Sequence, residues 1–135
     1  MIGLDTNVLI RYIVQDDEQQ ATAAADLIET GCTADTPGFV SLVVLCEICW
    51  VLARGYKYDR KTVASVVRHM LTSIELNIEE SDTAWRALAS FEAGKADFAD
   101  FIIGAHNRNH HAAPTYTFDR RAAMHADFEL VVLSA

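Results

Sequence analysis

The sequence predicts an α/β fold with a central, mainly parallel sheet, because of the way its apolar residues are spaced. Short apolar stretches, which are typical of buried strands, alternate along the chain with longer segments of helical spacing. Such an alternation indicates a parallel sheet covered by helices on both faces. The chain has 135 residues, of which 51% are hydrophobic, and this suits one domain whose core needs no disulfides. We therefore expect a single domain over residues 1–135.

The expected strands are short and end at turn residues or acids. Asp5 follows the first strand at once, the turn at Pro37 and Gly38 comes directly before the second, and Asp119 follows the fourth. The strands are expected at residues 2–4, 39–40, 75–78, 116–118 and 130–133. The pattern does not give the order of the strands in the sheet.

The expected helices are marked by capping residues and apolar spacing. Ser41 is expected to cap a helix that Gly55 ends, and Asp59 is expected to cap the next one. That next helix has apolar residues at offsets 0, 3, 4, 7, 8 and 11 from Val63 to Ile74, which is the clearest amphipathic pattern in the chain. The helices are expected at residues 8–14, 16–28, 42–54, 60–74, 81–93 and 98–108.

The formal net charge of the chain is −8, which is unfavourable for a protein that binds nucleic acid. The charge is uneven, however, because residues 54–68 carry five basic side chains and one acidic one. A local basic strip can steer a polyanion even when the total charge is negative. A solvated helix face explains the same pattern equally well. The candidate RNA-binding residues of this strip are Arg54, Lys57, Arg60 and Lys61.

The composition favours neither a membrane protein nor a secreted one. The longest apolar stretch, residues 42–53, contains Glu47 and is shorter than the roughly 20 residues that a membrane helix needs. The N-terminus lacks the basic segment of a secretory signal, so we expect a cytoplasmic protein. Cys46 and Cys49 form a C-x-x-C pattern, but they lie in an apolar helical run and fit buried core residues better than a redox pair.

Acidic residues recur where the expected strands end and the helices begin. Asp5 and Asp119 each follow a strand directly, and Glu47 lies in the second turn of the helix after another strand. Asp97 and Asp100 lie at the start of a further helix. Ligands of open parallel sheets bind outside the carboxyl ends of the strands. We therefore predict that several of these carboxylates converge at one edge of the sheet.

Glu47 is the most informative of these acids, because it is the only charged residue in the apolar run 42–53. A buried carboxylate is costly unless it is paired or binds a metal. A helix that is apolar nearly all round is expected to carry Glu47, buried, toward the sheet edge. The alternative is a solvent-facing acid or an ion pair, since amphipathic helices also carry such acids.

The remaining acids have a purely structural alternative as well. Asp5 could cap the helix that follows it, and Asp119 could cap a short helix starting at Arg120. Asp97, with Asp100 three positions later, resembles a capping box with Asp in place of Glu. Taken singly, capping explains each of them as well as catalysis does. Capping explains the set less well, because caps need not all lie at the same sheet edge.

Clustered carboxylates repel each other, and a divalent cation relieves this repulsion. Mg²⁺ and Mn²⁺ prefer oxygen ligands, usually a few carboxylates with water. Such a cation can activate water and neutralise charge on a phosphodiester, so the acids predict metal-assisted phosphodiester hydrolysis. A zinc site fits less well: His106 and His110 are four residues apart, but the glutamate of the H-E-x-x-H motif is missing between them.

Four blocks of the sequence stand out by their order and spacing. The blocks are MIGLDTNVL at residues 1–9, SLVVLCE at 41–47, ADFADFII at 96–103 and TFDR at 117–120. Together they resemble the PIN domain, and more narrowly the VapC-type toxins of bacterial toxin–antitoxin pairs. The resemblance extends over essentially the whole chain.

The resemblance implies a three-layer α/β/α fold with a central parallel sheet and an endoribonuclease that depends on Mg²⁺ or Mn²⁺. Asp97 lies beside the implied metal-binding acids and would be a second-tier ligand. The acids that the resemblance marks as catalytic and metal-binding are Asp5, Glu47, Asp100 and Asp119. The residues that would support the site are Thr6, Asn7 and Thr117.

The resemblance also implies partners: an RNA substrate such as a transfer or ribosomal RNA loop, a second copy in a homodimer, and a small antitoxin that inserts a segment into the active site. Other interpretations are a housekeeping RNA-processing nuclease and a PIN-fold module that binds RNA or protein without cleaving. A HAD-type phosphatase would need a second aspartate two positions after Asp5, where this chain has Asn7.

Overall fold

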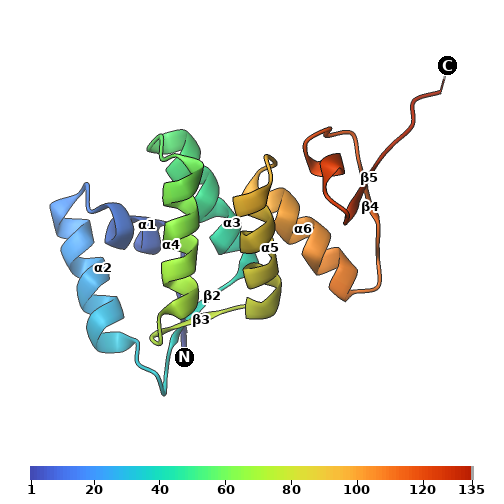
Figure 1. Ribbon diagram of the computed structural model, residues 1–135. Coiled ribbons are helices and arrows are strands. Elements are labelled where there is room, and N and C mark those ends of the chain that lie inside the picture. Colours follow the sequence, from blue (N-terminus) through green and yellow to red (C-terminus); the bar gives the residue numbers. More distant parts are fainter. Residues whose placement is uncertain (135) are drawn as a thin grey trace. The chain divides into compact units, whose positions relative to one another are not determined.

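The computed structural model describes residues 1–134, and helices and short strands alternate along it (Figure 1). The chain divides into two compact units, one ending at Ser81 and the other beginning at Asp82. Each unit is described by itself.

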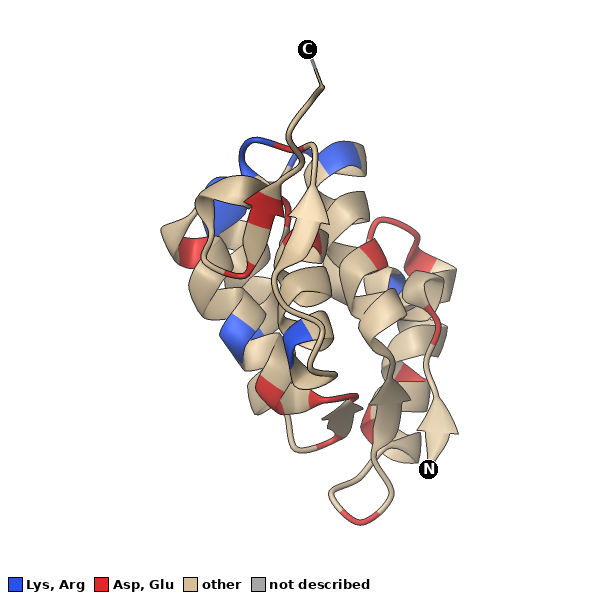
Figure 2. Cartoon of the chain, turned by 90° about the vertical axis from the view of Figure 1, so that its right-hand side faces the viewer, with Lys and Arg blue, Asp and Glu red and all other residues tan. Residues whose placement is uncertain are grey.

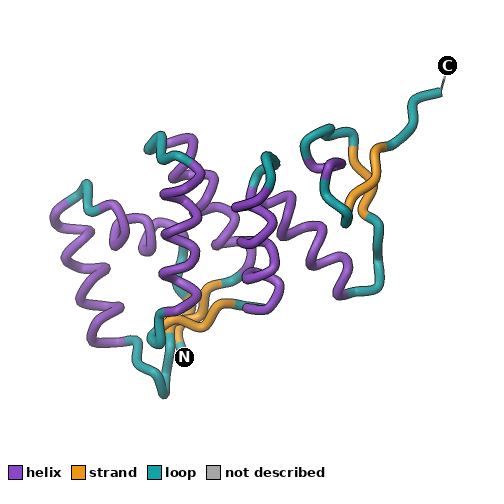
Figure 3. The backbone as a smooth tube through the Cα atoms, in the orientation of Figure 1, coloured by secondary structure: helices purple, strands orange, loops and turns teal. Residues whose placement is uncertain are grey.

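The first unit contains a parallel sheet of three short strands (orange in Figure 3) in the order β1-β2-β3. These are β1 (Ile2–Gly3), β2 (Gly38–Val40) and β3 (Leu76–Ile78). Further hydrogen bonds extend both ladders past the carboxyl ends of the strands: the Leu4 amide donates to the Phe39 carbonyl and the Glu79 amide to the Val40 carbonyl, both at 2.9 Å. Because the strands are parallel, their carboxyl ends meet at one edge of the sheet, as predicted.

Two pairs of helices connect these strands. Helices α1 (Thr6–Val14) and α2 (Glu18–Gly31) join β1 to β2. Helix α3 (Leu42–Trp50), a π-helical stretch (Val51–Gly55) and α4 (Arg60–Thr72) join β2 to β3. Both connections step across the sheet in the same direction, so right-handed crossovers place both pairs on one face. The contacts between α1 and α3 and between α3 and α4 agree with this.

The helix starts follow the predicted capping. The Ser41 side chain accepts a hydrogen bond from the Val44 amide at 3.2 Å, and Asp59 accepts one from the Thr62 amide at 2.8 Å. The core of this unit contains apolar residues from the strands and from the inner faces of the helices. It includes Leu9, Ile10, Ile28, Val40, Leu45, Ile48, Leu52, Val63 and Val67.

The second unit contains two helices and a two-stranded parallel sheet. Helix α5 (Ser81–Ala93) begins at the boundary residue and is followed by α6 (Phe98–Asn109). Strands β4 (Thr115–Thr117) and β5 (Phe128–Leu130) pair in parallel, and a short 3₁₀ helix (Ala122–Met124) lies between them in the chain. The core here includes Leu88, Phe91, Phe98, Phe101, Ile102, Ala105 and Phe128.

Several sequence-based boundaries differ from the structure, and the following three are among them. The last strand was expected at residues 130–133, but it begins at Phe128, whose ring is buried, and it ends where the Val131 amide donates to the Thr117 carbonyl. The helix expected at residues 42–54 changes to π-helical geometry after Trp50. Ile74, expected on the buried face of the next helix, is 75% exposed because α4 ends at Thr72. Among the described helices, none is both long and apolar enough to cross a membrane.

Candidate metal site of a nuclease

Three candidate site residues lie together in the first unit, at the carboxyl edge of its sheet. Asp5 follows β1, and Thr6 is the first residue of α1. The buried Thr6 hydroxyl donates a hydrogen bond of 2.7 Å to Oε1 of Glu47 on α3. This bond connects two segments that are 41 residues apart in the chain and brings the Glu47 carboxylate to the end of β1.

The expected burial of Glu47 is wrong, because the residue is exposed. Val43 and Trp50, four residues before it and three after, share its face of α3 and are 71% and 61% exposed. The apolar run therefore does not place every side chain in the core, since one face of α3 is open in this structure. The predicted position at the sheet edge is confirmed by the bond to Thr6. Because one carboxylate oxygen accepts that bond, the other remains open for a cation.

Asp5 is at the N-cap position of α1, but its side chain makes no capping hydrogen bond. The same is true of Asp97 at the N-cap of α6. Other acids at equivalent positions behave differently: Asp17 accepts a bond from the Gln20 amide at 3.0 Å, and Asp59 caps α4. Capping therefore explains Asp17 and Asp59 but does not explain Asp5 and Asp97.

The second group of acids lies within the second unit. Asp100, in the first turn of α6, is half-buried, and its amide donates to the Asp97 carbonyl at 3.0 Å. Loss of solvation raises the pKa of the Asp100 carboxyl, and repulsion from Asp119 and Asp97 raises it further. The structure thus brings three acids from two segments close enough to repel each other. This is the arrangement that a divalent cation relieves.

The turn that carries Asp119 has its own hydrogen bonds. Oδ1 of Asp119 accepts from the Arg121 and Ala122 amides at 2.8 and 3.1 Å, so this residue caps the turn that precedes the 3₁₀ helix. The Thr117 hydroxyl accepts from the Asp119 amide at 2.9 Å, in agreement with its predicted supporting position. Asp119 is therefore fixed through one oxygen, which leaves its second oxygen open. Asn7, by contrast, is exposed, and among residues 1–134 its side chain has no hydrogen-bond partner.

One further acid at the sheet edge was not singled out from the sequence. Glu79 follows β3 directly, and its Oε1 accepts a hydrogen bond of 2.8 Å from the Leu42 amide at the start of α3. The sequence signal for it was the same as for Asp5 and Asp119, an acid directly after a strand. Its carboxylate stabilises the amino end of α3, where the helix dipole favours a negative charge.

The predicted basic strip is exposed. Arg54 lies in the π-helical stretch, Lys57 lies between that stretch and α4, and Arg60 and Lys61 begin α4. Lys and Arg (blue in Figure 2) are fewer than the acidic residues (red), as the net charge of −8 requires. RNA binding by this strip stays a prediction.

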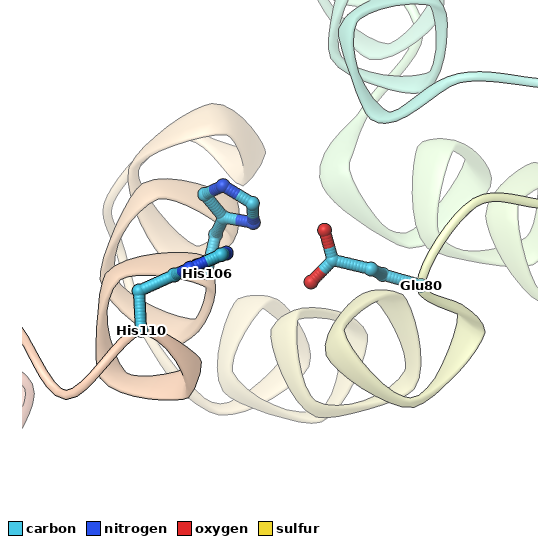
Figure 4. A group of neighbouring side chains, drawn as sticks. All are labelled: Glu80, His106 and His110. Atoms are coloured by element: carbon cyan, nitrogen blue, oxygen red, sulfur yellow. The ribbon is translucent and has the colours of Figure 1, made fainter.

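The structure does not support the alternative of a redox pair at Cys46 and Cys49. Cys46 and Cys49 are free thiols, and burial raises the pKa of Cys46 to about 11 and that of Cys49 further, so neither thiolate forms near pH 7. His106 and His110 project from the same side of α6 with ring centroids 4.6 Å apart. Figure 4 shows these two histidines, and it also labels Glu80.

Comparison with known proteins identifies the family. The family model described as "PIN domain" matches residues 2–128, which include both units and all the acids described above. Searches of curated proteins and of solved structures gave no significant match. The match confirms the three-layer α/β/α fold class that the resemblance implied. PIN domains are in general nucleases that use divalent metals on nucleic acid substrates. The chain therefore belongs to the PIN domain family.

Proposed function

We propose that this protein is a metal-dependent endoribonuclease and the toxin of a VapBC-type toxin–antitoxin pair. Asp5, Asp100 and Asp119 hold one or two Mg²⁺ or Mn²⁺ ions. Glu47 binds metal directly or through water, and Asp97 is a second-tier ligand. The products are a 5′-phosphate and a 3′-hydroxyl. A small antitoxin and a second copy of the chain are the proposed protein partners.

One observation supports the proposal most strongly: the acids of the candidate site keep carboxylate oxygens that make no hydrogen bond within the fold of residues 1–134. The Asp5 and Asp97 carboxylates make no capping bonds, and burial together with repulsion from Asp119 and Asp97 raises the pKa of Asp100. Glu47 and Asp119 each use one carboxylate oxygen in the fold and keep the other. A set of open carboxylate oxygens suits a hard divalent cation, whose preferred ligands are oxygen atoms.

When bound, the metal would supply an activated water and neutralise charge on the phosphodiester. The residues of the chain have separate tasks. Thr6 holds Glu47 in one orientation, and the Arg121 and Ala122 amides hold Asp119. Because these carboxylates are oriented before metal binds, little reorganisation is needed when it does.

The proposal is tested by comparing two aspartates at helix N-caps. Asp5→Ala removes a proposed ligand that makes no capping bond, so nuclease activity with Mg²⁺ or Mn²⁺ should be lost while the melting temperature stays close to that of the parent. Asp17→Ala removes a true cap, so it should cost about 1 kcal/mol of stability and leave the specific activity unchanged. The readouts are cleavage of RNA by purified protein and thermal melting.

The outcome also separates the alternatives. Metal-independent activity, or full activity in Asp5→Ala, would refute the proposed site. No cleavage by the parent with any metal would favour a non-catalytic PIN-fold module. If the parent cleaves RNA but no small open reading frame lies immediately upstream of its gene, a housekeeping nuclease is favoured over a toxin.

The hydrogen bond between Thr6 and Glu47 gives a further prediction. Thr6→Val keeps the shape of this buried side chain but removes the hydroxyl that orients the carboxylate. Loss of such an outer partner typically weakens metal affinity about 10- to 100-fold. A Mn²⁺ titration of activity should show this shift, whereas Thr22→Val on the exposed face of α2 should leave the titration unchanged. An unchanged Mn²⁺ midpoint in Thr6→Val would show that Glu47 needs no orienting partner.

A further inference from the structure

A pocket of about 440 Å³ lies within the second unit, beside its acidic group. It is formed by one side of α5, the connection to α6, the beginning of α6 and the segment around the 3₁₀ helix. Its volume falls in the range of sites that take small ligands. The residues that matter for its chemistry are Ser90, Lys95, Phe101, Arg121, Met124 and His125.

We propose that this pocket binds the nucleotide of a single-stranded RNA substrate that flanks the phosphodiester to be cleaved. The inference rests on the proposed function, because it assigns a substrate position next to the same site. The base packs against Met124 and the edge of Phe101, and Arg121 contacts the phosphate.

The position of the pocket along the chain connects it to the acids. The acidic group of this unit consists of Asp97, Asp100 and Asp119. Each of these acids has a residue that lines the pocket within two positions of it in the sequence. The connection is closest at Asp119, whose Oδ1 accepts the Arg121 amide at 2.8 Å. The carboxylate and the arginine therefore belong to one hydrogen-bonded turn. The other two pairs are Lys95 with Asp97 and Phe101 with Asp100.

The charge at the pocket complements a phosphate. Arg121 is exposed, and among residues 1–134 its side chain has no hydrogen-bond or ion-pair partner. A guanidinium can form two parallel hydrogen bonds with a phosphate. Two other arginines are paired with acids: Arg108 with Asp127 at 2.7 Å and Arg11 with Asp16 at 3.4 Å. In a chain of net charge −8, an open arginine beside three acids indicates a polyanionic ligand at this place.

The walls of the pocket suit an unstacked base and are already held in place. Met124 is 75% exposed, and the buried Phe101 ring meets the His125 ring edge-on at 5.5 Å. Nδ1 of His125 accepts the Asp127 amide at 3.0 Å, so the proton of the neutral ring is on Nε2, which donates to Ser90 Oγ at 3.0 Å. Proteins read single-stranded RNA largely through bases that pack against such side chains.

The test compares neighbouring arginines, of which only one lines the pocket. Arg121→Ala should raise the KM for a single-stranded RNA oligonucleotide about tenfold and change kcat little, because a phosphate contact away from the reacting atoms contributes uniform binding. Arg120→Ala, an exposed matched control, should leave both constants unchanged. Ala89→Phe fills the pocket without changing charge and should raise KM like Arg121→Ala.

A binding measurement makes the test independent of catalysis. Anisotropy of the fluorescein-labelled oligonucleotide in EDTA should show that Arg121→Ala lowers the slope of log affinity against log salt by about one, while Arg120→Ala does not. Photo-cross-linking with 4-thiouridine in the same RNA should label the peptides that contain Phe101 or Met124. Both arginines are exposed, so melting temperatures should match the parent.

The possible outcomes distinguish a failure of the pocket proposal from a failure of the proposed nuclease function. Metal-dependent cleavage with equal KM in Arg121→Ala, Ala89→Phe and the parent would overturn the pocket and leave the function intact. An equal loss in both arginine variants would indicate general charge attraction and also overturn it. Loss of RNA binding in Arg121→Ala alone, without cleavage by the parent, would support the pocket and reject the catalytic proposal. Cross-links confined to other peptides would reject RNA as the occupant in favour of a protein segment.

Discussion

Asp100→Asn is expected to lower the rate of metal-dependent RNA cleavage by at least about a hundredfold, because a metal that stabilises the transition state contributes several kcal/mol and each 1.4 kcal/mol is a factor of ten. Asp100 is the half-buried acid of the group in the second unit, and its carboxylate interacts with both Asp119 and Asp97. Asparagine keeps the size of the side chain but removes the negative charge that would hold a cation in the proposed site.

Asp100→Asn should not lower the stability of the metal-free protein, although it should abolish most of the activity. The raised pKa of Asp100 means that the folded protein holds this proton more tightly than the unfolded chain. The resulting stabilisation is fully present below the unfolded pKa of about 4 and is lost as the pH rises through the raised folded pKa. Without metal at neutral pH, the ionised carboxylate therefore destabilises the fold. Asp100→Asn should melt at the same or a higher temperature than the parent in EDTA at pH 7.

Metal addition separates the two effects of this substitution. Mg²⁺ or Mn²⁺ should raise the melting temperature of the parent, because a ligand that binds only the folded state stabilises it. Asp100→Asn should show little of this rise. Asp82→Asn is a matched control, since Asp82 is an exposed acid in the first turn of α5, as Asp100 is in the first turn of α6. A metal-induced shift that survives in Asp100→Asn but not in Asp82→Asn would contradict the assignment.

The helices of this protein could be predicted from the sequence because their signals are local. Ser41 and Asp59 cap α3 and α4 as expected, and Val63, Val67 and Met70 of the apolar spacing are buried on α4. Strand ends were predicted less well, because the length of a strand depends on the partner it pairs with. β5 begins at Phe128 rather than at residue 130 because its ladder with β4 fixes the register.

The acids of the candidate site could be predicted from the sequence, but the hydrogen bonds that their side chains make could not. Asp5, Asp17, Asp59 and Asp97 all stand before a helix, and the sequence treats them alike. The structure separates them, because only two of these carboxylates bond to the helix amides. The bond from Thr6 to Glu47 also joins residues 41 apart and has no local signal. Such distinctions depend on tertiary packing, which brings the side chains of distant segments together.

Gly104→Ala tests the packing of α6, and here the structure reverses the sign that helix propensity predicts. Alanine is favoured over glycine inside a helix by about 1 kcal/mol. At Gly104, however, an added Cβ would lie 2.6 Å from Cε2 of Phe128 and 3.3 Å from Cβ of Asp127. Both neighbours are buried, and Asp127 is held by Arg108 at 2.7 Å, so neither moves away cheaply. Overpacking of this kind typically costs about 1–3 kcal/mol.

The expected net result is a fall in melting temperature of about 3–8 °C, from the entropy of unfolding of a chain of this size. Gly31→Ala is the matched control, since Gly31 ends α2 and an added Cβ would meet only Leu27 at 3.6 Å, an ordinary contact. That variant should be neutral or more stable by up to about 1 kcal/mol. If both variants gained stability alike, Phe128 would not pack against α6 as the structure shows. Because Gly104 lies one turn after Asp100, a displaced α6 should also lower cleavage at temperatures where the variant is still folded.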